Sequence, residues 1–317
     1  MSKKWFNSDF NKLVRYDLFR MKRTKDFWNL FLIAFILYLV CGYVFLKVDI
    51  SIVSKNGNSL NSLIELEKKE NSTIEDLLRG YTETYEYSTD IASYSDYDKV
   101  KLLWGEGIYY NESFAVFFST CYRLTIHLLM IAIFIPLFVE NEYSVGFYKN
   151  LLNSIRRRYL PILSKFVVGF IYSLIWHVFM GICTIVVKLF YTGRIKWTMN
   201  KQCWIYFLVS FIITYAFVCV CLAVSEIFHR KSISLIFCIT FSLGLLSLPI
   251  SVVDTLINSV YPNSDFRITR YLLNEIAAKY YVGIISEFVN RAVVVSIVCI
   301  VISVALSVII NLRRDYR

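Results

Sequence analysis

The chain of 317 residues is unusually apolar: 57% of its residues are hydrophobic, only 18% are charged, and the formal net charge is +10. Its mean hydropathy is +0.53, whereas soluble domains are less apolar and carry about 25% charged residues. This composition excludes a disordered chain, a collagen and a disulfide-stapled secreted domain, and the long apolar runs argue against a soluble enzyme.

Six apolar runs are long enough to cross a bilayer as helices. About 20 residues at 1.5 Å each match the hydrocarbon core, and backbone in lipid must satisfy its own hydrogen bonds. We therefore expect an all-α polytopic membrane protein. With their connections, the predicted spans form one transmembrane domain over 28–317. The spans are 28–46, 115–139, 166–187, 203–225, 233–253 and 289–311.

The connecting segments divide into two groups by charge. One group holds 18 Lys and Arg in 66 residues, and the other holds 14 in 118 residues. Because cationic loops stay in the cytoplasm, we expect a multi-pass plasma (cell) membrane protein with both termini cytoplasmic. The net positive charge then reflects which connecting segments face the cytoplasm. We expect no basic folded domain that would bind nucleic acid. The basic group is 1–27, 140–165, 226–232 and 312–317; the other is 47–114, 188–202 and 254–288.

Residues 1–27 predict a basic amphipathic helix. Trp5, Phe6, Phe10 and Leu13 recur at steps of one, three and four, and lysines and arginines occupy most other faces. Such a helix lies in the headgroup layer with its aromatic side chains inserted. It is either a simple anchor or a strut that links the first span to a cytoplasmic motor.

Segment 47–114 is long for a connector, and it carries 13 acidic residues against 7 basic ones. Its length predicts a folded extracellular loop. The acidic, tyrosine-rich part is either a surface that receives a cationic peptide, or a solvated cap or dimer contact.

Arg123 and His127 lie inside the second predicted span, four residues apart, and so are expected to share a helix face. Arg123 can snorkel to the outer headgroups. Alternatively, both residues line a substrate path, because charged groups within a membrane often do.

Segment 140–165 begins with Glu140 and Glu142, where the second span leaves the membrane, and it continues into an arginine run. Carboxylates suit the start of a helix. The pattern predicts a short cytoplasmic helix that lies across the membrane, although an ordinary basic loop remains an alternative. The arginines that would reach lipid phosphates are Arg156, Arg157 and Arg158.

The residues of this segment stand at the spacing of a motif found in the type-2 ABC exporter permeases, a family that the chain resembles. The leader, which ends in Phe27-Trp28, and the six spans match that family's architecture, while Phe147 and Arg157 replace its usual Thr and Ser. The matching residues are Glu142-Tyr143, Gly146, Lys149, Leu151-Leu152, Arg158 and Ser164-Lys165.

The resemblance implies that 140–158 is a coupling helix held in a groove of a separate ATP-binding cassette subunit. Glu142 would pair with a basic residue of that subunit, and Tyr143 and Phe147 would supply apolar contact. The chain would then be half a transporter, a homodimer or a heterodimer with a homologous permease, with ATP and Mg bound by the partner. The residues implied in this contact are Glu140, Glu142, Tyr143, Gly146, Phe147 and Lys149.

The chain carries none of the sequence motifs of a nucleotide-binding loop, a zinc protease or a nucleophile elbow, so we expect no catalytic residues, no metal site and no cofactor of its own. The preferred hypothesis is the permease subunit of an exporter of amphipathic peptides or hydrophobic antimicrobial compounds. The alternative is an energy-independent receptor or immunity protein that binds a cationic peptide through its acidic outer loop. A membrane-embedded enzyme built on His127 and His177 is a further rival.

Overall fold

A computed structural model describes seven stretches of the chain, and every regular element within them is a helix. The outer loop up to residue 113 and the middle of the predicted coupling segment, 145–158, lie outside the described residues. The chain divides into two compact units. The described stretches are 2–41, 114–144, 159–192, 201–228, 230–260, 267–281 and 286–313. The first unit is Met1–Leu37, Ser119–Ile182 and Asn200–Arg317, and the second is Tyr38–Phe118 and Cys183–Met199.

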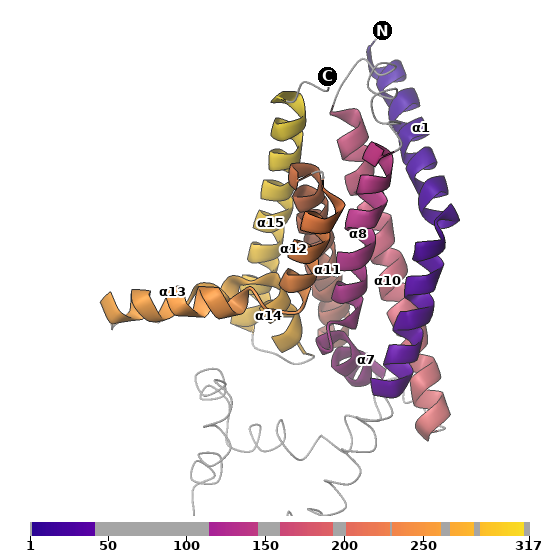
Figure 1. Ribbon diagram of the computed structural model, residues 1–317. Coiled ribbons are helices and arrows are strands. Elements are labelled where there is room, and N and C mark those ends of the chain that lie inside the picture. The colour runs from indigo at the N-terminus through magenta and orange to yellow at the C-terminus, as the bar shows by residue number, and fades with distance from the viewer. Residues whose placement is uncertain are drawn as a thin grey trace, which may run out of the picture. The chain divides into compact units, whose positions relative to one another are not determined.

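The first unit is organised around α11 (Lys201–Phe228), which packs against α8, α12, α14 and α15 (Figure 1). In its most apolar window 67% of α11 is buried, against 17% of α15. α11 is therefore the most buried of the three long apolar helices. The other elements are α1 (Ser2–Arg23), an unlabelled helix Lys25–Cys41, α7 (Phe114–Arg123), α8 (Ile126–Ser144), α10 (Leu160–Thr192), α12 (Lys231–Ser242), α13 (Ser247–Val260), the 3-10 helix η2 (Ile268–Tyr271), α14 (Leu273–Lys279) and α15 (Ser286–Arg313).

Three helices are straight, long and apolar enough to cross a membrane: Leu160–Phe190, Cys203–Phe228 and Ser286–Arg313. They contain the predicted runs 166–187, 203–225 and 289–311. Three further pairs of helices reach that length and hydropathy only when the two halves of each bent pair are counted together. The described residues thus hold three to six candidate spans, as in a membrane-embedded protein. The bent pairs are Phe10–Arg23 with Lys25–Cys41 (57°), Phe117–Arg123 with Ile126–Glu142 (49°) and Lys231–Ser242 with Ser247–Ser259 (61°).

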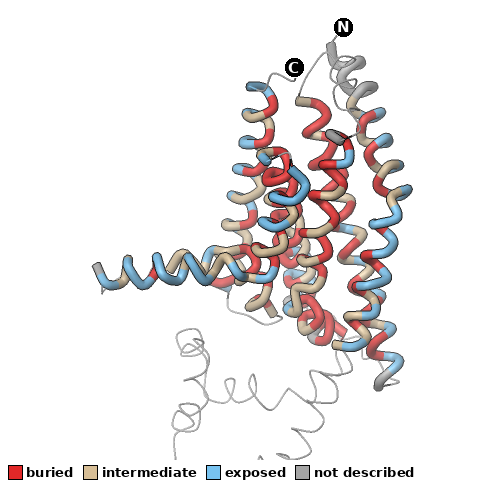
Figure 2. Tube along the Cα trace, in the orientation of Figure 1, coloured by how far each residue is buried: buried red, intermediate tan, exposed pale blue. Residues whose placement is uncertain are grey.

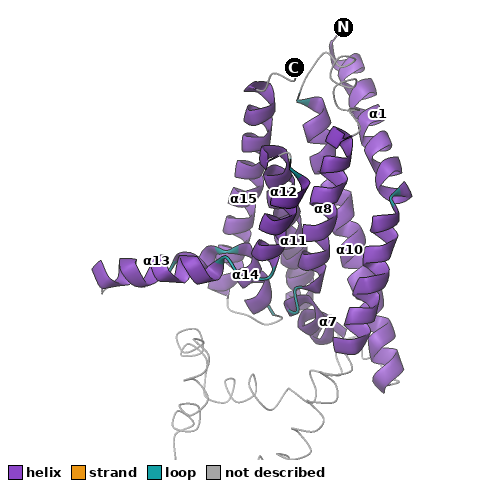
Figure 3. Cartoon of the chain, viewed as in Figure 1, coloured by secondary structure: helices purple, strands orange, loops and turns teal. Residues whose placement is uncertain are grey.

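The predicted span 233–253 is not one straight helix. α12 ends in a Schellman turn, in which Leu245 N donates to Thr240 O at 3.0 Å and Gly244 N donates to Phe241 O at 3.2 Å. Gly244 adopts φ +74°, a conformation that glycine accepts without steric cost. After this turn α13 runs crosswise to the bundle (Figure 3).

The predicted span 115–139 is also interrupted, between α7 and α8. Thr125 has φ 53°, which is unusual for a β-branched residue, and its amide donates to Tyr122 O at 3.0 Å. The leader and the first span meet earlier than predicted, at Thr24 rather than at residue 27. The Thr24 hydroxyl donates back to Arg20 O at 2.9 Å there, a bond that competes with regular helix geometry.

The burial pattern is that of helices packed through small residues with apolar side chains facing outward (Figure 2). On α15 the buried face carries Ala292, Ser296, Ser303 and Ser307, whereas its valines and isoleucines are largely exposed. On α10, a Cβ added at Gly169 would lie only 2.9 Å from Val218 of α11. Small residues that let backbones approach closely are typical of helix packing in lipid.

In the second unit the structure describes the end of helix Lys25–Cys41, the start of α7 and the end of α10. Phe114 and Phe118, one turn apart on α7, place their ring centroids 6.1 Å apart. Nearly all of the predicted outer loop also belongs to this unit but lies outside the described residues.

Candidate functional site

Five helices of the first unit bring charged and polar side chains together near the end of the bundle where α1 begins and α15 ends (Figure 1). These side chains are largely buried, although they come from distant parts of the chain. We call them the ion cluster. Its members are Asp17 and Arg20 of α1, Glu140 and Glu142 of α8, Ser164 and Lys165 of α10, Glu226 of α11 and Asn311 of α15.

Lys165 stands at the centre of the ion cluster. Its Nζ lies 2.8 Å from Glu142 Oε2 and 2.6 Å from Glu226 Oε1, and none of the three side chains is more than 2% exposed. Asn311 Nδ2 donates to the second oxygen of Glu226 at 3.2 Å. A buried cation shared by two carboxylates offsets much of the cost of removing these charges from water. Lys165 therefore joins α8, α10 and α11, and Asn311 adds α15.

Arg20 ties the leader helix to α8. Its Nη1 lies 2.6 Å from Glu142 Oε1, and its Nη2 donates to the carbonyl oxygen of Phe138 at 3.2 Å. The guanidinium also lies over the Phe138 ring, 4.0 Å from the centroid, in cation–π geometry. Glu142 thus receives both cations of the cluster.

Asp17 lies on the same buried stripe of α1 as Leu13 and Met21, one residue per turn. Its Oδ2 is 2.6 Å from the hydroxyl of Ser164, while its Oδ1 is 3.9 Å from Arg20. The Ser164 hydroxyl also lies 2.8 Å from the carbonyl oxygen of Pro161. The Asp17–Ser164 contact connects the leader helix to the beginning of α10.

Members of the ion cluster lie at both ends of segment 140–165, which the sequence pattern marks as a coupling segment. Glu142 is two residues from the end of α8, and Lys165 is in the second turn of α10. Their direct ion pair closes the chain on itself around residues 143–164. The same ion pair is also bonded to α1 and α11.

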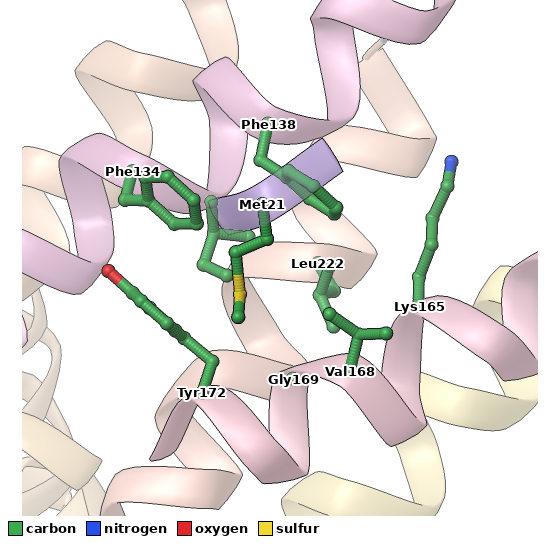
Figure 4. A pocket seen from close by; sticks show the side chains of 9 residues that line it. Met21, Phe134, Phe138, Lys165, Val168, Gly169, Tyr172 and Leu222 are labelled. Carbon is green, nitrogen blue, oxygen red and sulfur yellow. The ribbon is translucent and has the colours of Figure 1, made fainter. Parts of the chain in front are cut away.

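A small apolar gap borders the cluster, with no room for a water molecule (Figure 4). Met21, Phe134, Phe138 and Gly169 are among its lining residues, and the Lys165 ammonium group points away from them. The gap marks loose packing rather than a ligand site.

Among the predicted coupling residues, the structure places two within this cluster. Glu142 is paired inside this chain with Arg20 and Lys165. Glu140 is 7% exposed, and its Oε1 has no hydrogen-bond partner within the described part of the chain. Tyr143 belongs to the last turn of α8, but its side chain is outside the described residues. Outside them as well are Gly146, Phe147, Lys149, Arg156, Arg157 and Arg158.

The predicted membrane anchors on the leader are described only in part. Phe10 is half-buried, whereas the side chains of Trp5 and Phe6 are outside the described residues. Exposed aromatic side chains that the structure describes on these helices include Phe19 and Trp28, at 62% and 58% exposure. They lie closer to the bend between the leader and the next helix than the sequence pattern indicates.

Arg123 and His127 do not share a helix face, so that interpretation is wrong. The break at Thr125 puts Arg123 at the end of α7 and His127 at the start of α8. Arg123 is exposed and donates from Nε to the carbonyl oxygen of Ala278 at 3.0 Å, in the last turn of α14. His127 is fully buried, with its ring centroid 4.5 Å from that of Tyr122.

The surroundings of His127 form a second buried polar group. The Tyr122 hydroxyl donates to the Ser210 carbonyl oxygen at 3.0 Å, and His177 Nε2 lies 3.2 Å from the Ser210 hydroxyl. Within the described stretches, no three His, Cys, Asp or Glu side chains are arranged to hold a metal ion. The membrane-embedded enzyme built on His127 and His177 therefore stays a prediction.

Comparison with known proteins adds nothing to this picture: no family model, no curated protein and no solved structure matches the chain. The functional argument therefore depends on the sequence pattern and on the geometry of the ion cluster.

Sequence reasoning identified Glu142 and Lys165 through the motif but missed that they bind each other. It also missed the roles of Asp17, Arg20 and Asn311. One signal was available, because Lys165 and Glu226 directly flank predicted apolar spans, where an unpaired charge is costly.

Proposed function

We propose that the chain is the permease subunit of an ATP-driven exporter in the plasma membrane. It would have six spans, three of them bent, and cytoplasmic termini. It would pair with itself or with a homologous permease, and two separate ATP-binding cassette subunits would bind ATP and Mg. Support comes from the motif over 142–165 and from the ion cluster at its two ends.

The observation that carries the proposal is the Glu142–Lys165 ion pair, at 2.8 Å, across the ends of the coupling segment. Energy released by ATP hydrolysis in a partner subunit can drive transport only if a local displacement at the contact moves several helices together. The pair meets this need, because Arg20 and Glu226 extend it to α1 and α11. A plain connector between two spans would not need a buried junction with three other helices.

This geometry changes the role that we assign to Glu142. Its two oxygens lie 2.6 Å and 2.8 Å from cations of this chain, so we assign it to force transmission rather than to contact with the partner. Contact with the ATP-binding subunit is then assigned to Tyr143, Gly146, Phe147 and Lys149. Lipid anchoring is assigned to the leader and to Arg156, Arg157 and Arg158.

The cargo class follows from the apolar spans and the family resemblance. We propose amphipathic peptides or hydrophobic antimicrobial compounds, which can enter from the membrane between two permease copies. The alternative, an energy-independent receptor, depends on the acidic outer loop, which lies outside the described residues.

The first test is gentle detergent purification of the tagged chain, expressed from its natural neighbourhood of genes. We expect a nucleotide-hydrolysing subunit in the eluate at one copy per permease. A chain that purifies without such a subunit, yet binds cationic peptide, would contradict the exporter and support the receptor.

A second test separates contact from folding. Phe147→Asp places a charge in the proposed apolar contact, and we expect at least about a tenfold loss of partner affinity, equal to about 1.4 kcal/mol. Pull-down of the ATPase measures this loss. Ser259→Asp, at an exposed position near the end of α13, is the matched control and should leave binding unchanged. Equal binding by both variants would argue against a docking role for the segment.

A further inference from the structure

The Ser164 hydroxyl has two acceptors in reach, and it satisfies both contacts at once only if Asp17 carries a proton. The Ser164 hydroxyl has a single hydrogen, yet its oxygen lies within hydrogen-bond distance of both Asp17 Oδ2 and Pro161 O. A serine in a helix commonly donates to a carbonyl three or four residues back, as Ser164 does here toward Pro161. The contact of 2.6 Å with Asp17 then lacks a donor unless Asp17 itself supplies it.

The charges of the ion cluster lead to the same point. Among the described residues of the ion cluster, four carboxyl groups (Asp17, Glu140, Glu142 and Glu226) are at most 7% exposed, and two cations, Arg20 and Lys165, pair with three of them, Asp17, Glu142 and Glu226. If these six described groups were all ionised, together they would carry an excess of two negative charges. Excess buried charge is costly, and proteins commonly remove it by binding a proton.

Asp17 is less closely paired with a cation than Glu142 and Glu226 are. Glu142 has Arg20 at 2.6 Å and Lys165 at 2.8 Å, and Glu226 has Lys165 at 2.6 Å. Asp17 has only Arg20, at 3.9 Å, and that guanidinium is already bonded to Glu142. The groups that face Asp17 are Arg20 from its own helix, Glu142 from α8, and Ser164 and Lys165 from α10.

We propose that Asp17 is a proton-binding site that controls the attachment of the leader helix to the bundle. In the protonated form the carboxyl group donates to Ser164 Oγ, and the hydroxyl donates to Pro161 O, so both contacts are satisfied. Loss of the proton removes one donor and adds a fourth negative charge to a cluster that has two described cations, Arg20 and Lys165. The contact between α1 and α10 weakens as a result. The inference does not depend on the exporter proposal.

The sign of the pH effect follows from proton counting. An exposed aspartic acid ionises near about pH 4, so above that pH the unfolded chain has lost the proton while the folded chain retains it. Folding then favours the proton-bound state, and stability falls as pH rises, by up to about tenfold in the unfolding equilibrium per pH unit. The contribution is complete at acid pH and disappears once the folded protein also releases the proton.

The test compares heat unfolding of the purified full chain, in one detergent, between about pH 5 and about pH 9. Asp17→Asn mimics the protonated acid, because its amide donates to Ser164 Oγ. We expect it to match the unsubstituted chain at the acid end and to become more stable than it as pH rises. Asp26→Asn, at an exposed position one residue into the next helix, is the matched control and should follow the unsubstituted chain at every pH.

Infrared spectroscopy provides a second readout that is independent of unfolding. The unsubstituted chain should show the carbonyl stretch of a protonated carboxyl group at neutral pH, and Asp17→Asn should reduce it. An Asn variant that is unstable or unfolded across the whole pH range would overturn the proposal. So would an infrared band that the substitution leaves unchanged.

Discussion

Lys165 is the residue on which the ion cluster most depends, because it is the only described cation that contacts both Glu142 and Glu226. Lys165→Met keeps the length of the side chain but leaves these two carboxylates without their shared cation. Breaking a buried ion pair from one side costs about 3–5 kcal/mol. We expect a large fall in the unfolding temperature, measured by the fluorescence of the tryptophans in detergent.

The control for this change is Lys12→Met, since Lys12 lies exposed on α1. A second chain that combines Lys165→Met with Glu226→Gln removes one of the stranded charges and should recover part of the lost stability. If Lys165→Met and Lys12→Met were equally stable, the cluster would not hold the helices together.

At the scale of elements, the helix breaks at Gly244 and Thr125 can be tested by substitution, because both residues have a positive φ that favours Gly or Asn. Gly244→Ala forces a Cβ into a left-handed conformation, at a cost of about 1 kcal/mol. The added atom would also lie 3.0 Å from Asn274 Nδ2. Gly244→Asn adds the same Cβ, but Asn tolerates this conformation better, so the difference between the two variants isolates the backbone term.

At Thr125 a β-branched residue already occupies the left-handed conformation, which such residues rarely adopt. Thr125→Asn should therefore raise stability by up to about 1 kcal/mol, as seen in the unfolding temperature. A loss of stability with Asn would mean that packing of the threonine side chain outweighs the backbone cost at this break.

Hydropathy predicted the three straight spans well because length and apolar content alone define them. It failed at the two internal breaks, since a window average does not depend on the backbone angles of one residue. Gly244 was the available signal, because a single glycine within an apolar run is a candidate helix end. Thr125 gave no comparable signal, because threonine rarely ends a helix in this way.

For the whole molecule, the charge pattern makes a testable prediction about orientation. Arg313 at the end of α15 and Ser259 near the end of α13 are both exposed. In a background without the eight native cysteines, Arg313→Cys should react with an impermeant maleimide only from the cytoplasmic side. Ser259→Cys should react only from outside.

A chain that keeps Cys221 as its one cysteine serves as the control. Cys221 is fully buried in α11 and should react only after denaturation. Labelling of Arg313→Cys and Ser259→Cys from the same side would contradict the proposed topology.

The helical, membrane-embedded character of the chain follows from local physics. Bilayer thickness and the need to satisfy backbone hydrogen bonds act on each apolar run separately, so the amino-acid order was sufficient to recognise it. The same order marked residues 140–165 as special through their motif. It did not reveal which residues bind Glu142, because those partners, Arg20 and Lys165, belong to two other helices. Packing of α1, α8, α10, α11 and α15 brings them together, and it makes internal partners of residues that looked like contacts for another protein.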